Sequence, residues 1–366
     1  MVKLYGADAL RYTLVAGMGL GADVMLDPQD LEKSFAPGRN FATKLWNIGR
    51  FLLTNVGTEP VLPITEVRGD QLRRADAWIL DRLDVAVREC DRAIGPLSPV
   101  TNDSWRSEEL TAGLRLNEYA ETARRFVWNE LADWYLEAIK TRLATPGDDR
   151  EVARAVLLHV FDQALRLLHP IVPFVTEALW QKLPGHVDGT FLATTSWPSE
   201  SGRTEAHALA GEFELIREIV DAMRRVRSEY NVPPSQAIDA FVVAAPGVQQ
   251  TLESESTLLM RLTKTSLAAV ERAPAGPAAN VILSGGTELI VPLEGLIDVA
   301  KECARLRTEL AGLEKQLASL EARLENPGFV SRAPAQVVES ERAKATEWRT
   351  RRELLRTRIE GLCGVA

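Results

Sequence analysis

Apolar residues recur at helical spacing through most of the first half of the chain. The run FATKLWNIGRFLLTN places Phe41, Leu45, Ile48 and Leu52 at intervals of four, three and four. This spacing forms one apolar stripe of an amphipathic helix. Further amphipathic helices are predicted at residues 72–93, 110–143 and 151–168, with a short helix opening at Pro173. Helices joined by mostly short connections pack as an antiparallel bundle, so a mainly α fold is expected.

The segment before this helix has a weaker pattern. Residues 4–11 suit a short helix, in which Asp8 is interpreted as a helix-start or surface charge rather than as a catalytic acid. A turn is expected at residues 17–27, because glycine adopts the positive φ that tight bends need. Pro28 can then open another short helix, since its fixed φ suits a first helical turn.

Beyond about residue 186 the pattern becomes mixed. Residues 186–203 are rich in Gly, Ser, Pro and Thr and are predicted to form a loop. A helix is expected at residues 206–230. Short strands are predicted at 238–245, 267–271, 281–283 and 288–291, with a helix at 248–263 and a hairpin turn at 284–286. These elements predict a small α/β module.

The last part of the chain carries a narrow apolar seam. At alternating intervals of four and three, it passes through Val299, Cys303, Leu306, Leu310, Leu313, Leu317, Leu320 and Leu324. A period of 3.5 is typical of a coiled coil. The sequence Asn-Pro-Gly at 326–328 breaks the seam, which resumes at Val338 and reaches Leu362 with Glu341 and Arg352 in apolar slots. An antiparallel helical hairpin is the simplest interpretation, and dimerisation is the alternative.

Composition and motifs exclude several classes of protein. The 366 residues are 46% hydrophobic and 26% charged, as in folded soluble proteins. No stretch approaches the roughly 20 apolar residues that span a bilayer, so no membrane partner is expected. No zinc-protease, phosphate-loop or nucleophile-elbow pattern occurs, and no catalytic or metal-binding residue is predicted. Cys90, Cys303 and Cys363 form no disulfide framework, so reduced thiols in a cytoplasmic protein are expected.

Charge is unevenly distributed along the chain. The net charge is −8, yet residues 301–360 contain 13 Lys and Arg against 10 Asp and Glu, a net of +3. A basic projecting hairpin fits a phosphate-backbone partner. It also fits an ordinary solvated coiled coil, in which charges flank the seam.

One helix face combines basic and amide side chains. No Asp or Glu occurs from Lys33 to Thr58. Basic groups neutralise phosphates, amides reach base edges, and aromatic rings stack on unpaired bases. On this helix, Asn40, Lys44 and Asn47 line one face, and Arg39, Thr43, Trp46 and Arg50 line the next. The competing interpretation is a solvated face with Trp46 partly in the core.

The order of motifs resembles a known family. The runs YGADALRYTL, GRNFATKLWNIGRF, FVWNELADWYLEAIK, LLHPIVPFVTEALWQKL and RRVRSEYNVPP are similar to the C-terminal half of class I aminoacyl-tRNA synthetases of the valine, isoleucine and leucine group. The terminal hairpin, entered through LIVPLEGLIDVAKE and broken at NPGFVSRAPAQVV, resembles the valyl type. The resemblance covers nearly the whole chain.

This resemblance implies a domain plan and a partner. It implies a junction after the catalytic domain at 1–30, a helical anticodon-binding bundle at 31–200, a helix with a small α/β module at 201–295, and a coiled-coil tRNA-binding arm at 296–366. The implied partner is tRNA, expected to be tRNA(Val), held at the anticodon stem-loop and elbow. The candidate contact residues are Arg39, Asn40, Lys44, Asn47, Arg50, Arg124, Trp128, Arg224, Arg227, Asn231, Arg305, Lys315, Arg323 and Lys344.

The sequence departs from the family by lacking the catalytic motifs. Neither the His-Ile-Gly-His motif nor the Lys-Met-Ser-Lys-Ser loop occurs. No stand-alone aminoacylation is therefore predicted, and ATP would be used by a catalytic domain absent from this sequence. A separate catalytic half is a possible partner, and the chain is expected to be a monomer. The alternatives are a free-standing RNA-binding or coiled-coil assembly factor derived from a synthetase, and an isoleucyl-type fragment.

Overall fold

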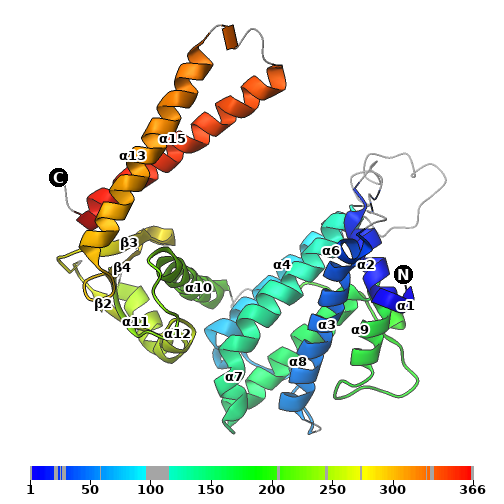
Figure 1. Ribbon diagram of the computed structural model, residues 1–366. Coiled ribbons are helices and arrows are strands. Elements are labelled where there is room, and N and C mark those ends of the chain that lie inside the picture. Colours follow the sequence, from blue (N-terminus) through cyan, green and yellow to red (C-terminus); the bar gives the residue numbers. More distant parts are fainter. Residues whose placement is uncertain are drawn as a thin grey trace. The chain divides into compact units, whose positions relative to one another are not determined.

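The computed structural model of the chain is predominantly helical (Figure 1). It describes residues 2–19, 24, 26, 30–57, 59–95, 115–203, 207–243, 246–272, 274–326, 328–329 and 334–363. The chain divides into two compact units, Met1–Phe213 and Glu214–Ala366. In these described ranges no helix is long and apolar enough to cross a membrane. The predicted sequence of helical bundle, α/β module and helical hairpin is confirmed.

The first unit is a helical bundle. Its helices are α1 (Val2–Tyr5), α2 (Ala7–Gly17), α3 (Leu31–Val56), α4 (Arg74–Ile94), α6 (Leu116–Arg125), α7 (Leu136–Ala144), α8 (Asp148–Leu168) and α9 (Pro173–Trp180). A π-helical segment, η4 (Phe126–Tyr135), joins α6 directly to α7. Short 3-10 turns are η1 (Ile64–Glu66), η2 (Gly69–Gln71) and η5 (Leu192–Thr194). The helices predicted at 72–93, 110–143, 151–168 and from Pro173 agree with these bounds within a few residues, and positions 110–114 lie outside the described residues. The single short helix predicted at 4–11 is wrong, because Gly6 separates α1 from α2, and α2 continues to Gly17.

Helix α3 is longer than its periodic run indicates. It begins at Leu31, where the carboxylate of Asp30 accepts a hydrogen bond from the N–H of Lys33 at 3.0 Å. Pro37 lies inside the helix, where it removes one backbone donor. A Cβ atom on the next residue, Gly38, would lie 2.7 Å from a backbone oxygen of α2, so glycine permits the two helices to cross closely. The short helix predicted at Pro28 lies outside the described residues.

Helix α2 holds the turn between α8 and α9. Asp8 is only 7% exposed, and its carboxylate accepts hydrogen bonds from the N–H groups of Phe174 (3.1 Å) and Val175 (2.7 Å) at the start of α9. Arg11 donates to the carbonyls of residues 170 and 171 at 2.8 and 3.1 Å. The interpretation of Asp8 as a helix-start charge is confirmed, because it lies in the first turn of α2. The alternative of a surface charge is wrong, because its buried carboxylate caps α9. Burial raises the pKa of this carboxyl group.

The core of the bundle contains a buried carboxylate. Asp76 of α4 is fully buried, and it accepts hydrogen bonds from the Tyr135 hydroxyl at 2.8 Å and from the N–H of Arg73 at 3.0 Å. It also forms an ion pair with Arg142 at 2.8 Å. Burial raises the pKa of Tyr135 well above its usual value, so the phenol stays a proton donor. This network fixes α4 against η4 and α7.

The second unit begins with most of α10 (His207–Glu229) and a four-stranded sheet. The elements are β1 (Ile238–Val243), α11 (Pro246–Ser254), α12 (Ser256–Thr263), β2 (Thr265–Val270), β3 (Ala278–Ile282), η7 (Ser284–Gly286) and β4 (Glu288–Pro292). The strand order is β2-β1-β4-β3, with β1 and β2 parallel and the other pairs antiparallel. The predicted strands are confirmed within three residues. The single helix predicted at 248–263 is wrong, because Glu255 interrupts it.

The arm is an antiparallel pair formed within one chain (Figure 1). Helices α13 (Val299–Glu325) and α15 (Ala335–Cys363) bury the predicted seam between them. Its buried members are Cys303, Leu306, Leu313, Leu317, Leu320, Val338, Ala345, Leu355 and Leu362. Glu341, in an apolar slot, forms an ion pair with Arg323. The hairpin interpretation is therefore confirmed.

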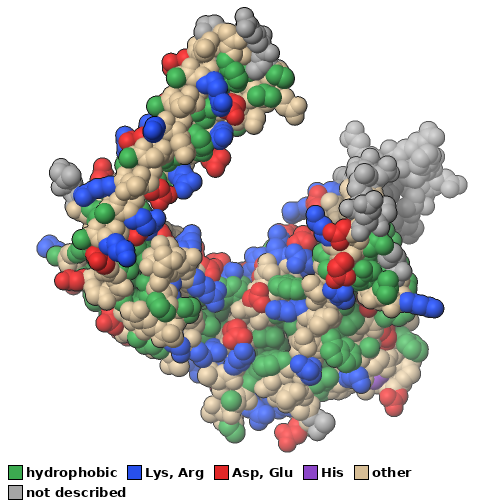
Figure 2. Space-filling model, in the orientation of Figure 1, with side chains coloured by type: hydrophobic (Ala, Val, Ile, Leu, Met, Phe, Trp, Pro, Cys, Tyr) green, Lys and Arg blue, Asp and Glu red, His purple; other side chains and the backbone are tan. Residues whose placement is uncertain are grey.

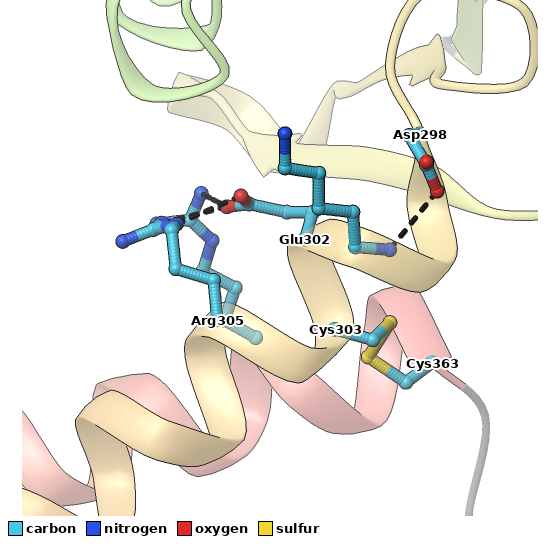
Figure 3. Close-up of a disulfide and its surroundings, with 7 residues drawn as sticks. Asp298, Glu302, Cys303, Arg305 and Cys363 are labelled. Atoms are coloured by element: carbon cyan, nitrogen blue, oxygen red, sulfur yellow. Dashed lines mark hydrogen bonds and ion pairs between the residues drawn. A yellow bond between two sulfur atoms is a disulfide. The ribbon is translucent and has the colours of Figure 1, made fainter.

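A disulfide joins the two helices at the base of the arm (Figure 3). Cys303 of α13 and Cys363 of α15 are 60 residues apart in sequence, yet their Cα atoms lie 6.0 Å apart. The expectation of reduced thiols is wrong for this pair, because antiparallel packing brings the two ends of the hairpin together. Cys90 is buried and free, and burial raises the pKa of its thiol to about 12.

Candidate nucleic-acid interface

The polar face of α3 meets solvent. Because the apolar stripe of this helix is fully buried, the opposite side chains point outward. Asn40, Asn47 and Arg50 are exposed, and Arg39 and Lys44 are half-buried beside them. The basic and amide side chains singled out in the sequence therefore remain accessible to a ligand.

Three candidate side chains, one each from α3, α6 and η4, meet at one point. The ammonium of Lys44 on α3 lies 5.1 Å from the ring centre of Trp128 on η4. The guanidinium of Arg124 on α6 lies 6.0 Å from the same ring. Phe41 stacks on Trp128 with ring centres 6.4 Å apart and supports the indole from the core. A half-buried aromatic ring between two cations suits an anionic, base-bearing ligand.

Acidic neighbours pair with three of the candidate cations. Lys44 pairs with Asp133 at 2.9 Å, and Arg39 pairs with Glu32 at 2.5 Å. Arg124 pairs with Glu121, and the hydrogen bond between them lowers the pKa of that carboxyl group, which keeps the pair ionised. Exposed ion pairs contribute only about 0.2–1 kcal/mol, so a phosphate can displace the carboxylates at low cost. Within the described ranges Arg50 has no ion-pair partner, which leaves its guanidinium available.

One exposed aromatic residue on this surface was not among the candidate contact residues. Trp46, which the helical spacing places on the face of Arg39, Thr43 and Arg50, is 43% exposed. It lines an open hollow of ≈ 500 Å³ with Tyr5, Arg39 and Phe174, the last 63% exposed. The signal was its spacing, seven residues after Arg39 and four before Arg50, which places an indole between two cations.

The candidates at the end of α10 do not form one surface. Arg224 is exposed and pairs with Asp221 at 3.3 Å, and Asn231 is exposed with a positive φ of 54°. Arg227 is only 7% exposed, and its guanidinium donates to the carbonyls of residues 233, 236, 263 and 264 at 2.8–3.1 Å. The proposal of Arg227 as a contact residue is therefore corrected, since it holds α10 to the chain around the sheet.

The arm candidates divide into paired and unpaired cations. Arg305 pairs with Glu302 and Glu309, and Arg323 pairs across the hairpin with Glu341. Lys315 is exposed without an ion-pair partner among the residues that the structure describes. Lys344 is also exposed, with its ammonium 4.8 Å from the ring centre of Trp348. The two lysines are therefore the more accessible candidates.

The described part of the chain contains no group of three or more His, Cys, Asp or Glu side chains that could hold a metal ion.

Two family models match the chain. Residues 105–242 match the anticodon-binding domain of tRNA ligase, which runs from before α6 into β1. Residues 298–363 match the valyl tRNA synthetase tRNA binding arm, which corresponds to α13 and α15. Trp128 and Arg124 lie within the first match, whereas the α3 side of their surface, including Lys44, precedes it. The lysine-bearing hairpin is the second match.

Similar proteins span the chain almost completely. The valine--tRNA ligase of Geobacter sulfurreducens is 36% identical over 98% of this chain, and that of Nitratidesulfovibrio vulgaris is 37% identical over 95%. The enzyme of Geobacillus stearothermophilus is 34% identical over 99%. The chain spans only 37–39% of the length of these relatives. It therefore belongs to the valine--tRNA ligase family, of which it carries the anticodon-binding region and the tRNA-binding arm.

Proposed function

We propose that this chain binds tRNA(Val), with the α3–η4 surface on the anticodon stem-loop and the arm near the elbow. The observation that carries the proposal is the meeting of Lys44, Arg124 and Trp128 beside exposed Asn40, Asn47 and Arg50. Basic side chains neutralise phosphates, and amides and the indole can contact unpaired bases of a loop. The family matches support the same partner.

In this proposal the chain positions the tRNA, and the chemistry is done elsewhere. Binding the anticodon arm and elbow orients the acceptor end toward an active site on another segment. The binding energy then contributes to specificity and to the effective concentration of the acceptor end. ATP and the groups that activate valine belong to that other segment, so the chain alone is expected to have no aminoacylation activity.

We further expect a monomer in the cytoplasm. The apolar seam of the arm is covered within one chain, because α13 and α15 bury each other's apolar residues. A second copy is therefore not needed to cover the seam. Sedimentation of the full chain across a concentration series tests this expectation, and a stable dimer would contradict it.

The direct test is titration of the full chain with tRNA(Val) and with a tRNA for another amino acid across a salt series. We expect tighter binding of tRNA(Val) and an affinity that falls steeply with salt, because phosphate contacts release counterions. Equal affinity for both tRNAs, or an affinity independent of salt, would overturn the proposal.

A matched pair of variants locates the contact. Arg50→Gln should weaken tRNA(Val) binding about fivefold and reduce the salt slope by about one, as expected for one lost phosphate contact. Arg68→Gln is the control, because Arg68 is an exposed arginine of the same unit that lies outside α3 and pairs with Asp70. Equal effects of the two changes would argue against the α3 surface.

A further inference from the structure

An open cavity lies against the disulfide at the base of the arm. Its volume is ≈ 720 Å³, and both cysteines line it. The other lining residues are Gly276, Pro277, Val299, Ala300, Arg307, Gly361 and Leu362. Cys303 is only 6% exposed, whereas Cys363 is half-buried. A small molecule can therefore reach the disulfide from one side, and Cys363 is the more accessible half.

The cavity contains an arginine without an acidic partner in the described ranges. Arg307 follows Cys303 by four residues in α13, so the two side chains lie on the same helix face. The nearby Glu302 pairs with Arg305 and with Arg358, and the pair of Glu302 and Arg305 lies away from the disulfide (Figure 3). A guanidinium beside a sulfur atom favours the thiolate form and attracts an anionic thiol.

The last turns of α15 attach the arm to the rest of the second unit. Arg358 pairs with Glu229 at the end of α10 at 2.7 Å and with Glu302 at 3.3 Å. Its guanidinium also lies 4.5 Å from the ring centre of Tyr230. Cys363 follows five residues later, at the end of the helix. The disulfide therefore fixes the helix end that carries these contacts.

We propose that Cys303–Cys363 is a thiol–disulfide exchange site for a small anionic thiol of the glutathione type. We further propose that its redox state sets how firmly the end of α15 is held. The first thiolate attacks Sγ of Cys363, which breaks the S–S bond and forms a mixed disulfide. Cys303 leaves as a thiolate beside Arg307.

A second thiolate completes the exchange. It attacks the mixed disulfide, the two small thiols leave joined by an S–S bond, and Cys363 becomes a thiolate. Both protein thiolates then take up protons. Overall, two small thiols are oxidised to their disulfide, and the protein disulfide is reduced to two thiols. Without the bond, the last turns of α15 are held only by packing and ion pairs, and they open more often.

The chemistry is tested with the full chain in buffers of defined ratios of reduced and oxidised glutathione, with thiols trapped by alkylation and located by mass spectrometry. We expect Cys303 and Cys363 to interconvert with the ratio while buried Cys90 stays reduced. In Cys303→Ser, Cys363 should take up glutathione about tenfold faster than Cys303 does in Cys363→Ser, because it is more exposed. Equal rates, or uptake by Cys90 at the same rate, would overturn the proposal.

A second pair of variants tests the role of the cavity arginine. Arg307→Gln should slow reduction by glutathione about threefold, because the thiolate and the incoming anion lose their cation. Arg305→Gln is the matched control, since Arg305 lies in the same helix but points away from the sulfur atoms. The same slowing in both variants would show that only net charge matters, and it would contradict an exchange site at this cavity.

Hydrogen exchange measures the effect on the arm. Reduction should raise exchange in residues 352–363 and leave α4 of the bundle unchanged. Unchanged exchange in α15 after complete reduction would overturn the structural part of the proposal.

The effect on tRNA binding rests on the proposed function. The reduced chain should bind tRNA(Val) about threefold more weakly, because a loosely held arm loses more conformational entropy on binding. If neither form binds tRNA, the proposed function fails, but hydrogen exchange and thiol labelling still test the redox proposal. Equal binding of tRNA(Val) by both forms would contradict coupling between the redox state and tRNA binding.

Discussion

The bundle and the arm use their basic side chains differently. On the bundle, Lys44 and Arg124 converge on one aromatic ring, although their acidic partners lie close by. On the arm, arginines pair with glutamates of the facing helix, as Arg351 does with Glu309 at 2.8 Å and Arg356 with Glu314 at 2.7 Å. Figure 2 shows basic and acidic side chains intermixed along the visible face of the arm. A local excess of positive charge therefore does not by itself mark contact residues, because many arginines of the arm join its two helices.

The interiors of the two regions differ as well. The bundle has a broad core that encloses a fully buried carboxylate and its partners. The arm has only a narrow apolar seam, which exposed ion pairs flank. Substitutions should therefore be costly in the bundle and mild in the arm, and the predictions below test this contrast from the largest expected effect to the smallest.

The largest effect is expected from Asp76→Ala. Removal of the carboxylate leaves the Tyr135 hydroxyl buried without its partner and leaves Arg142 paired with Asp149 alone, so the bundle should lose about 2–4 kcal/mol of unfolding free energy. Urea denaturation followed by tryptophan fluorescence measures this, because all tryptophans except Trp348 precede residue 214. Asp70→Ala, at an exposed pair with Arg68, is the control and should change the value by at most about 0.5 kcal/mol. Similar losses for the two variants would contradict the network.

Replacing a glycine by alanine should have opposite effects on stability in the two regions. Gly38→Ala should destabilise the bundle by about 1–3 kcal/mol, since the new methyl group would meet the backbone of Ala9. Gly312→Ala in α13 should stabilise the arm by about 0.5–1 kcal/mol, because open space surrounds this glycine and alanine favours a helix. Hydrogen exchange resolved along the chain measures both, and the same sign at both sites would contradict the contrast.

Lysines and arginines of the arm should differ in their effect on tRNA binding. Lys315→Ala combined with Lys344→Ala should reduce the salt slope by about two, because each lysine is expected to contact a phosphate. Arg351→Ala combined with Arg356→Ala should leave the slope nearly unchanged and weaken the hairpin by about 0.2–1 kcal/mol per pair. Salt titrations with tRNA(Val) check this prediction. Equal slope changes would show that pairing does not determine the contacts.

Mild acid should weaken the bundle more than the arm. Burial lowers the pKa of His159 and of His169, and no histidine follows residue 207. The folded state favours the neutral imidazole of these histidines. The stability that this preference contributes is present above the unfolded pKa of about 6.5, and it is lost as the pH falls through the folded pKa. The fluorescence-detected stability should fall between pH 7 and pH 5.5. His159→Gln should reduce that pH dependence, and an unchanged dependence would exclude His159 as a cause.

Repeating local patterns made most of the fold predictable. Phe41 and Leu45 repeat at helical spacing, and Leu313 and Leu317 continue a strict seam, so element type and hairpin pairing follow from the sequence. The exposed polar face of α3 follows from the same periodicity, because burial of one stripe exposes the other. Whether any of these residues contacts tRNA stays a prediction.

Features that depend on distant partners could not be predicted in the same way. Arg227 is a surface candidate in the sequence, yet carbonyls as far away as residue 264 surround its guanidinium. The meeting of Lys44 with Trp128 depends on how α3 packs against η4. The disulfide could have been inferred, because the hairpin places Cys303 at its start and Cys363 at its end. The odd number of cysteines and the expected cytoplasmic location argued against a disulfide.

The contacts of Asp8 and Arg11 have a mechanical consequence. The Asp8 carboxylate on α2 binds the positive end of α9, and Arg11, one turn away, binds carbonyls of the turn between α8 and α9. These contacts couple α2 to the end of α8 and to the start of α9. A displacement of α2 would therefore move both ends of the turn between α8 and α9 in the same direction. Phe174 lies at the start of α9 beside Trp46. A displacement of α2 would therefore change the shape of the hollow lined by Tyr5, Trp46 and Phe174 before it affected the buried core.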